Sequence, residues 1–135
     1  MKKNLIQYFI TLIIQGCNQV ENKIIGKWER INDESKGMAI TVSKEKEMFI
    51  GRISQITDAN EFDGFAIDDV KWKEIQYIED GRYKFQDLWK GVATTGQIEE
   101  IGYGEGYIEI NNDKITIKHT KDNKIGREQE WIRKK

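Results

Sequence analysis

Along most of this chain, hydrophobic residues recur at every second position in short runs separated by glycine, asparagine or aspartate. A period of two is typical of strands that bury one face, and these separating residues favour turns. Asn111-Asn112-Asp113, between two isoleucine-bearing runs, and Glu79-Asp80-Gly81 are the clearest turns. The pattern predicts strands over eight segments: 24–31, 37–43, 47–56, 69–79, 82–91, 105–110, 113–119 and 125–133.

Most links between these segments are short, which predicts one all-β domain of consecutive antiparallel strands. Eight such strands form an up-and-down meander, and closing it into a β-barrel removes both exposed edges. Two links are longer. Residues 57–68 have room for one helical turn, with Asp58 as N-cap and Glu61 in capping-box spacing. Residues 92–104 have no steady period and are predicted to be a loop.

The alternation also predicts which side chains point into the barrel. In 82–91, Tyr83, Phe85, Asp87 and Trp89 share one face, and charged or polar residues occupy the other. Because the aromatic face should be the inner one, Asp87 is expected to point inward. A carboxylate there must be solvated, protonated or paired with a base such as Arg127.

Two later strands also bring polar residues to a shared or inner face. These are His119 in 113–119, beside Ile115 and Ile117, and the set Arg127, Gln129, Trp131 and Arg133 in 125–133. In 69–79 the phase changes between Trp72 and Ile75. One extra residue near Lys73-Glu74, a β-bulge, would explain that change.

The first seventeen residues follow a different pattern. Two lysines precede an apolar run over 5–14, and Gly16 precedes the only cysteine, Cys17. This is typical of an export signal, and the run is shorter than the about 20 residues of a membrane-spanning helix. Ile14-Gln15-Gly16-Cys17 resembles the lipobox of bacterial lipoproteins. The resemblance implies that Cys17 is lipidated and becomes residue one, while a secretory signal without lipid and a buried core helix are the alternatives.

Removing residues 1–16 as a signal peptide changes the charge of the chain. The remaining 119 residues carry 20 basic and 23 acidic residues, a net charge of −3. That balance leaves no electrostatic footprint for nucleic acid. We therefore expect a lipidated tether over 17–23 and one domain over 24–135, anchored by lipid to a membrane of the bacterial cell envelope on a periplasmic or surface-facing side.

Gly26-Lys27-Trp28 opens the first predicted strand, and Trp131 and Arg133 lie in the last. These residues resemble the lipocalin-type (calycin) barrels. With 49–53 and 129–133, they are also similar to exported bacterial proteins of unknown function that have a lipocalin-like barrel. The resemblance implies that Trp28, Trp131 and Arg133 close one barrel end, with Arg133 or Arg127 over the indole of Trp28.

Two functions fit a lipid-anchored barrel. The first is binding of a small apolar or amphiphilic ligand, with the candidate residues Phe49, Tyr83, Phe85, Asp87, Trp89, His119 and Gln129. The second is an envelope protein-interaction module, such as an accessory subunit or an inhibitor of a periplasmic enzyme, with a filled barrel and binding loops at 57–68 and 92–104. A pocket of roughly 300 Å³ or more, lined by the aromatic residues, favours the ligand. The polar candidates could instead only pair with one another.

No familiar catalytic or metal motif is present in the sequence. It has no His-Glu-X-X-His motif, no serine nucleophile elbow and a single histidine. Residues 58–64 fail the EF-hand register, although an irregular cation site at Asp63, Asp68 and Asp69 stays open. The glycines of 102–106 precede a strand, so a turn is predicted rather than a phosphate loop. We expect no enzyme activity, no metal and no cofactor.

Overall fold

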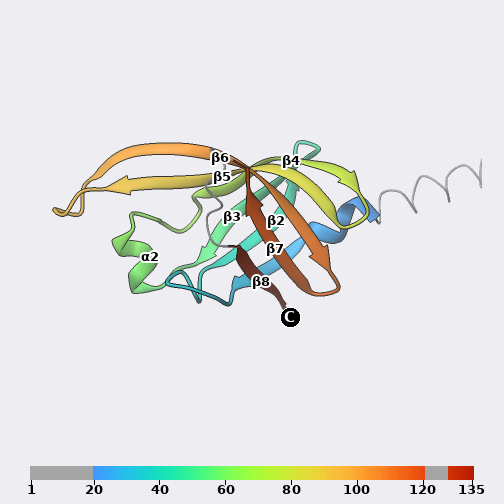
Figure 1. Ribbon diagram of the computed structural model, residues 1–135, viewed down its shortest axis with the longest axis horizontal. Helices are drawn as coiled ribbons and strands as arrows, with labels where there is room; N and C mark the ends of the chain where they lie inside the picture. The colour runs from blue at the N-terminus through green and yellow to red at the C-terminus, as the bar shows by residue number, and fades with distance from the viewer. Residues whose placement is uncertain (1–19, 121–127) are drawn as a thin grey trace, which may run out of the picture.

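The computed structural model describes residues 20–120 and 128–135. Every strand pairs antiparallel with the next, and β1 also pairs with β8, so the predicted up-and-down barrel is confirmed (Figure 1). A 3-10 turn, η1 (Asn22–Ile24), precedes the barrel, and a short helix, α2 (Asp58–Phe62), links β3 and β4. The strands are β1 (Gly26–Arg30), β2 (Ala39–Glu45), β3 (Met48–Gln55), β4 (Val70–Glu79), β5 (Arg82–Val92), β6 (Ile98–Asn111), β7 (Lys114–His119) and β8 (Gln129–Lys134).

The predicted signal peptide, Cys17 and Arg127 lie outside the described residues. Among those residues, no helix is both apolar enough and long enough to cross a membrane.

The loop predicted over 92–104 is wrong for most of its length, because β6 begins at Ile98. β6 pairs with β5 as far as Val92 but with β7 only from Gly106 onward. The paired strands therefore run on beyond the barrel, as Figure 1 shows. We call this extension, residues 88–105, the overhang.

Two predicted local features, the helix cap before β4 and the bulge within β4, can be compared with the structure. The capping box of α2 is one residue earlier than predicted, because Thr57, not Asp58, caps the helix and Asn60 completes the box. The predicted bulge in β4 is confirmed: the register with β5 shifts between Lys73 and Gln76, and Glu74 has a φ of 51°.

Large aromatic side chains fill the centre of the barrel. Trp72 packs edge-on against Trp131 and Phe85, with ring centroids 5.0 Å and 6.0 Å apart. Phe49 and Tyr83 meet in the same manner at 6.4 Å. These residues belong to a single buried cluster, so the interior of the barrel is a packed core.

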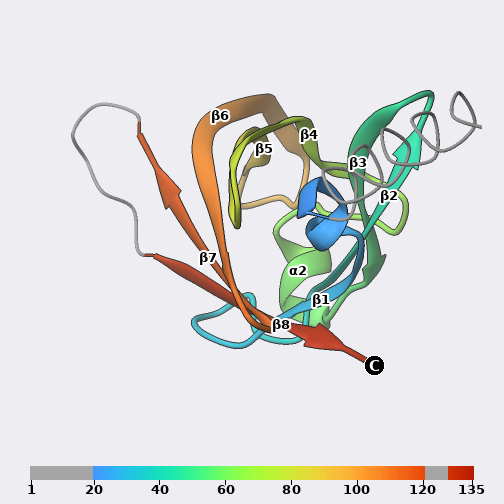
Figure 2. The same ribbon diagram turned by 90° about the vertical axis from the view of Figure 1, so that its right-hand side faces the viewer.

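The end of the barrel near the N-terminus is closed by η1, which lies across it in Figure 2. The Arg133 guanidinium stands 4.2 Å from the ring centroid of Trp28 and donates to the carbonyl oxygens of Lys23 and Ile25. The predicted contact between Arg133 and Trp28 is therefore present. A side chain at Gly26 would displace the Arg133 guanidinium, because its Cβ would lie 2.7 Å from Nη1, and the φ of 140° at this position favours glycine.

Candidate functional site

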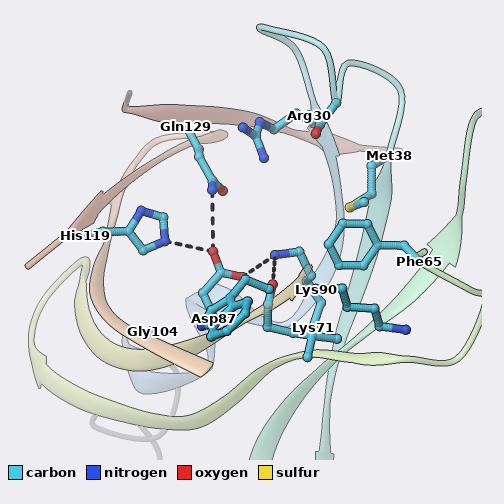
Figure 3. A pocket seen from close by; sticks show the side chains of 12 residues that line it. Arg30, Met38, Phe65, Lys71, Asp87, Lys90, Gly104, His119 and Gln129 are labelled. Atoms are coloured by element: carbon cyan, nitrogen blue, oxygen red, sulfur yellow. Dashed lines mark hydrogen bonds and ion pairs between the residues drawn. The ribbon is translucent and has the colours of Figure 1, made fainter. Parts of the chain in front are cut away.

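The opposite end of the barrel, where the overhang begins, contains a pocket of about 330 Å³. The ends of β1, β5 and β7, the starts of β4 and β8, and the segments after β1 and α2 all contribute to it. Its lining consists of Arg30, Ser35, Met38, Phe65, Lys71, Asp87, Leu88, Trp89, Lys90, Gly104, His119 and Gln129. Figure 3 shows these side chains converging from several strands on one space.

Asp87 lies at the base of this pocket and is almost completely buried. One carboxylate oxygen accepts a hydrogen bond from the Lys71 ammonium at 2.5 Å. The other lies 2.8 Å from Nε2 of His119 and accepts from Nε2 of Gln129 at 3.4 Å (Figure 3). Asp87, His119 and Gln129, three of the predicted site residues, are thus brought together by strands β5, β7 and β8.

The Asp87 carboxylate is ionised because its partners outweigh the effect of burial. Burial alone would raise the pKa of Asp87, but the charge of Lys71 and the hydrogen bonds from His119 and Lys71 hold this pKa below its usual range. The base that pairs with Asp87 is therefore Lys71, whereas Arg127, the expected partner, lies outside the described residues.

Sequence alternation missed Lys71 because β3 and β4 do not pair regularly there. Gly51 pairs with Trp72 and the next residue, Arg52, pairs with Val70, which leaves Lys71 as an extra residue in β4. Such a bulge turns a side chain to the opposite face. The ammonium of Lys71 consequently reaches the interior and also donates to the carbonyl oxygen of Leu88 at 2.7 Å.

Three glycines of β6 make room for the pocket. Gly106, Gly104 and Gly102 pair with Phe85, Asp87 and Trp89, so each glycine lies beside a large inward-facing residue of β5. The turn predicted for 102–106 is wrong, because the segment is the middle of a strand. Its glycines leave open the inner face on which bulky side chains of the neighbouring strand lie.

The glycines differ in how much space surrounds them. A Cβ at Gly102 would lie 2.4 Å from the indole of Trp89, so the indole rests directly on this glycine. At Gly104 a Cβ would meet only Trp89, at 4.0 Å. Gly104 therefore borders open space within the pocket, beside an indole that is 43% exposed. Trp89 lies at the mouth of the pocket and is not part of the core.

The remaining predicted residues do not line this pocket. Phe49 and Tyr83 lie toward the closed end, and Phe85 is buried in the core below Asp87. Phe49 instead borders a separate hollow of about 490 Å³, together with Glu21, Glu47, Met48, Glu74, Ile75, Gln76 and Tyr77. The predicted aromatic lining is therefore mostly a filled core, and the pocket is lined by other residues.

Two further cations, Arg30 and Lys90, line the pocket, and the strand pattern did not identify them. Arg30 pairs with Asp33, and its guanidinium lies 5.4 Å from the ring centroid of Trp131. Lys90 pairs with Asp69 at 2.8 Å and donates to the carbonyl oxygen of Gly64. Arg30 is the last residue of β1, and Lys90 lies beyond the last pair that β5 forms with β4, so alternation alone did not show that their side chains reach the pocket.

In the described part of the chain, no group of three or more His, Cys, Asp or Glu side chains is placed to hold a metal ion. Asp69, one member of the irregular cation site considered from the sequence, instead accepts from Lys90 and from the backbone of Ala66.

No protein-family model, curated protein or solved structure matches this chain. The closed eight-stranded barrel is consistent with the resemblance to lipocalin-like barrels. Any function must therefore be argued from the pocket itself.

Proposed function

We propose that this protein is an exported lipoprotein whose barrel binds a small amphiphilic ligand in the pocket at its open end. The observation that carries the proposal is the space beside Gly104: a 330 Å³ pocket with apolar and polar walls lies there, next to the packed aromatic core. Met38, Phe65 and Trp89 provide apolar surface, and the group around Asp87 provides polar contacts. An apolar wall with a few convergent polar groups is the usual composition of a small-molecule site.

The anchor part of the proposal rests on the sequence before Val20. If Cys17 is lipidated, only two residues, Asn18 and Gln19, lie between it and Val20, and the three steps from Cys17 to Val20 span at most about 11 Å. At the closed end, the backbone carbonyl oxygen of Glu21 accepts a hydrogen bond from the Tyr83 hydroxyl. This end would then lie near the membrane. The pocket, at the other end of the barrel, would face away from the membrane.

The anchor is tested by metabolic labelling with a fatty-acid analogue. Cys17→Ser should abolish the label, because a hydroxyl does not replace the thiol that accepts the lipid. The unsubstituted protein, labelled in parallel, is the control. Label that persists on the Cys17→Ser protein would contradict the lipoprotein assignment.

The ligand is tested by native mass spectrometry of the protein purified from its own host. Gly104→Leu should occupy the pocket, since a Cβ at this position would contact only Trp89, at 4.0 Å. Gly91→Leu is the matched control: it lies on β5 outside the pocket lining, and its Cβ would have only ordinary contacts from 3.5 Å. We expect a bound small molecule in the wild type and in Gly91→Leu but not in Gly104→Leu. Retention of the molecule by a folded Gly104→Leu protein would place the ligand elsewhere.

A protein-interaction role is the second candidate, and the overhang favours it. Ile98 and Ile101 are 45% and 61% exposed there, on strands that extend beyond the barrel. Exposed apolar side chains on a projecting hairpin are typical of protein contacts. A photo-crosslinker at position 101, compared with one at Ile132 on β8, should yield an adduct in the intact envelope only if the overhang binds a partner.

We propose binding rather than catalysis. The Asp87–His119 pair could orient a general base, but within the described residues no hydroxyl or thiol hydrogen-bonds His119. Asp87 is also tied to Lys71 in a buried ion pair. This arrangement holds the pocket floor together and offers no nucleophile.

A further inference from the structure

The polar groups that line the pocket are mostly hydrogen-bond donors. Among the described residues, Asp87 is the only carboxylate in the lining, and Lys71, His119 and Gln129 already occupy both of its oxygens. The other polar side chains in the lining are those of Arg30, Ser35 and Lys90. A ligand that enters this pocket therefore meets mainly hydrogen-bond donors of the protein and few free acceptors.

Arg30 has donor capacity that the described protein leaves unused. Its Nε donates to Asn32 at 3.4 Å and its Nη2 to Asp33, whereas Nη1 has no hydrogen-bond partner among the described residues. The side chain is largely buried, and Figure 3 shows its guanidinium turned toward the space above Asp87. A guanidinium is suited to an oxyanion because its donors match the two oxygens of a carboxylate.

Gln129 presents a second donor to the same space. Its side-chain oxygen accepts from the indole nitrogen of Trp131 at 3.2 Å, which fixes the amide nitrogen on the side of Asp87. An amide nitrogen carries two hydrogens, and only one of them is engaged by the carboxylate. Gln129 and Arg30 thus face one space from neighbouring strands, as Figure 3 shows.

The cations that line the pocket among the described residues, Arg30, Lys71 and Lys90, are each paired with a carboxylate. Their partners are Asp33, Asp87 and Asp69, so the charges of these three pairs balance. A preference for an anion therefore depends on the donor hydrogens of Arg30 and Gln129 that the described residues leave free.

We infer that the ligand is a small carboxylic acid whose carboxylate accepts from Arg30 and Gln129, while its apolar body lies against Trp89 and Phe65. This inference rests on the proposed function, that the pocket binds a small ligand at all. The pocket of about 330 Å³ has room for a short body, such as one ring or a chain of a few carbons.

The test compares acids with their neutral amides. Binding of phenylacetate and hexanoate, and of phenylacetamide and hexanamide, is followed by protein-observed NMR on the purified protein. We expect at least one acid to bind about tenfold or more tightly than its amide, because a charge-assisted pair is lost in the amide. Equal affinities of acid and amide would overturn the inference but leave the proposed function standing. Absence of binding by all four probes would also overturn the inference, whereas the proposed function is decided by the native mass spectrometry of the protein from its own host.

Variants of Arg30 test whether its charge is responsible for the preference for an acid over its amide. Arg30→Met should remove the preference for the acid, and Arg30→Lys should restore part of it, since the charge returns without the planar fork. Arg52→Met is the matched control, because Arg52 pairs with Glu45 on the outer surface away from the pocket. A full preference in folded Arg30→Met would contradict the role of Arg30. If Arg30→Met does not fold, the wild-type comparison of acid with amide still decides.

Discussion

Replacing Asp87 with Asn tests whether the floor of the pocket stabilises the barrel. The substitution keeps the shape but removes the charge, so the buried Lys71 ammonium, 2.5 Å away, loses its counter-ion. The new amide nitrogen would also face His119 or Gln129, both placed as donors. Removing one partner of a buried ion pair costs on the order of 3 to 5 kcal/mol, mostly from the charge left uncompensated.

The free energy of unfolding is measured by urea denaturation at pH 7 for the wild type and for Asp87→Asn. Asp80→Asn is the matched control, since Asp80 and Lys23 form an exposed pair and such pairs contribute about 0 to 1 kcal/mol. Adding Lys71→Met to Asp87→Asn should recover part of the loss, because no unpaired buried charge remains. A loss below about 1 kcal/mol for Asp87→Asn would refute the reasoning.

The lowered pKa of Asp87 also predicts how its contribution to the free energy of unfolding depends on pH. The folded pKa of Asp87 is lowered, because the charge of Lys71 and the hydrogen bonds overcome the effect of burial. The ordinary pKa of an unfolded aspartate is about 3.9. The stabilisation is therefore present above about pH 4 and is lost as the pH falls through the folded pKa. The difference between wild type and Asp87→Asn should be constant from neutral pH down to about pH 5 and should shrink below it.

Three further predictions concern packing and titration. Trp28→Ala, which removes a fully buried indole, should lower the free energy of unfolding by about 3 to 5 kcal/mol, and an unchanged denaturation midpoint would show that Trp28 is not core. Gly106→Ala should lower the free energy of unfolding by about 1 to 3 kcal/mol, because its Cβ would lie 2.8 Å from the Lys118 carbonyl oxygen. Gly104→Ala should lower it by less than about 0.5 kcal/mol. Equal losses of stability for the two variants in thermal melts would contradict this. Burial raises the pKa of Tyr83 to about 12. The free energy of unfolding should therefore be intact below pH 10, the ordinary pKa of tyrosine, and should fall as the pH rises toward 12. An equal fall in Tyr83→Phe would assign the loss to another group.

Elements whose signal is local could be predicted from the amino-acid sequence alone. Alternating residues identified the eight strands, and the phase change in β4 located the bulge at Lys73-Glu74. The alternation also identified Asp87 and His119 as inward-facing, because every second side chain of a regularly paired strand points the same way. Trp28 and Arg133 could be linked only through the resemblance to lipocalin-type barrels, and the structure places the Arg133 guanidinium over the Trp28 indole.

The role of each inward-facing residue depends instead on how the strands pair and where they end. Lys71 faces the interior because β3 and β4 pair irregularly, and a strand's own sequence does not specify its partner's register. The glycines of 102–106 predict a turn, because a strand face without side chains shows no hydrophobic period. Their pairing with Phe85, Asp87 and Trp89 shows that they instead make room for the bulky side chains of β5. Depth along the barrel also depends on where neighbouring strands end. For that reason, Phe85 is core, Asp87 lies at the base of the pocket and Trp89 lies at its mouth, although all three share one face.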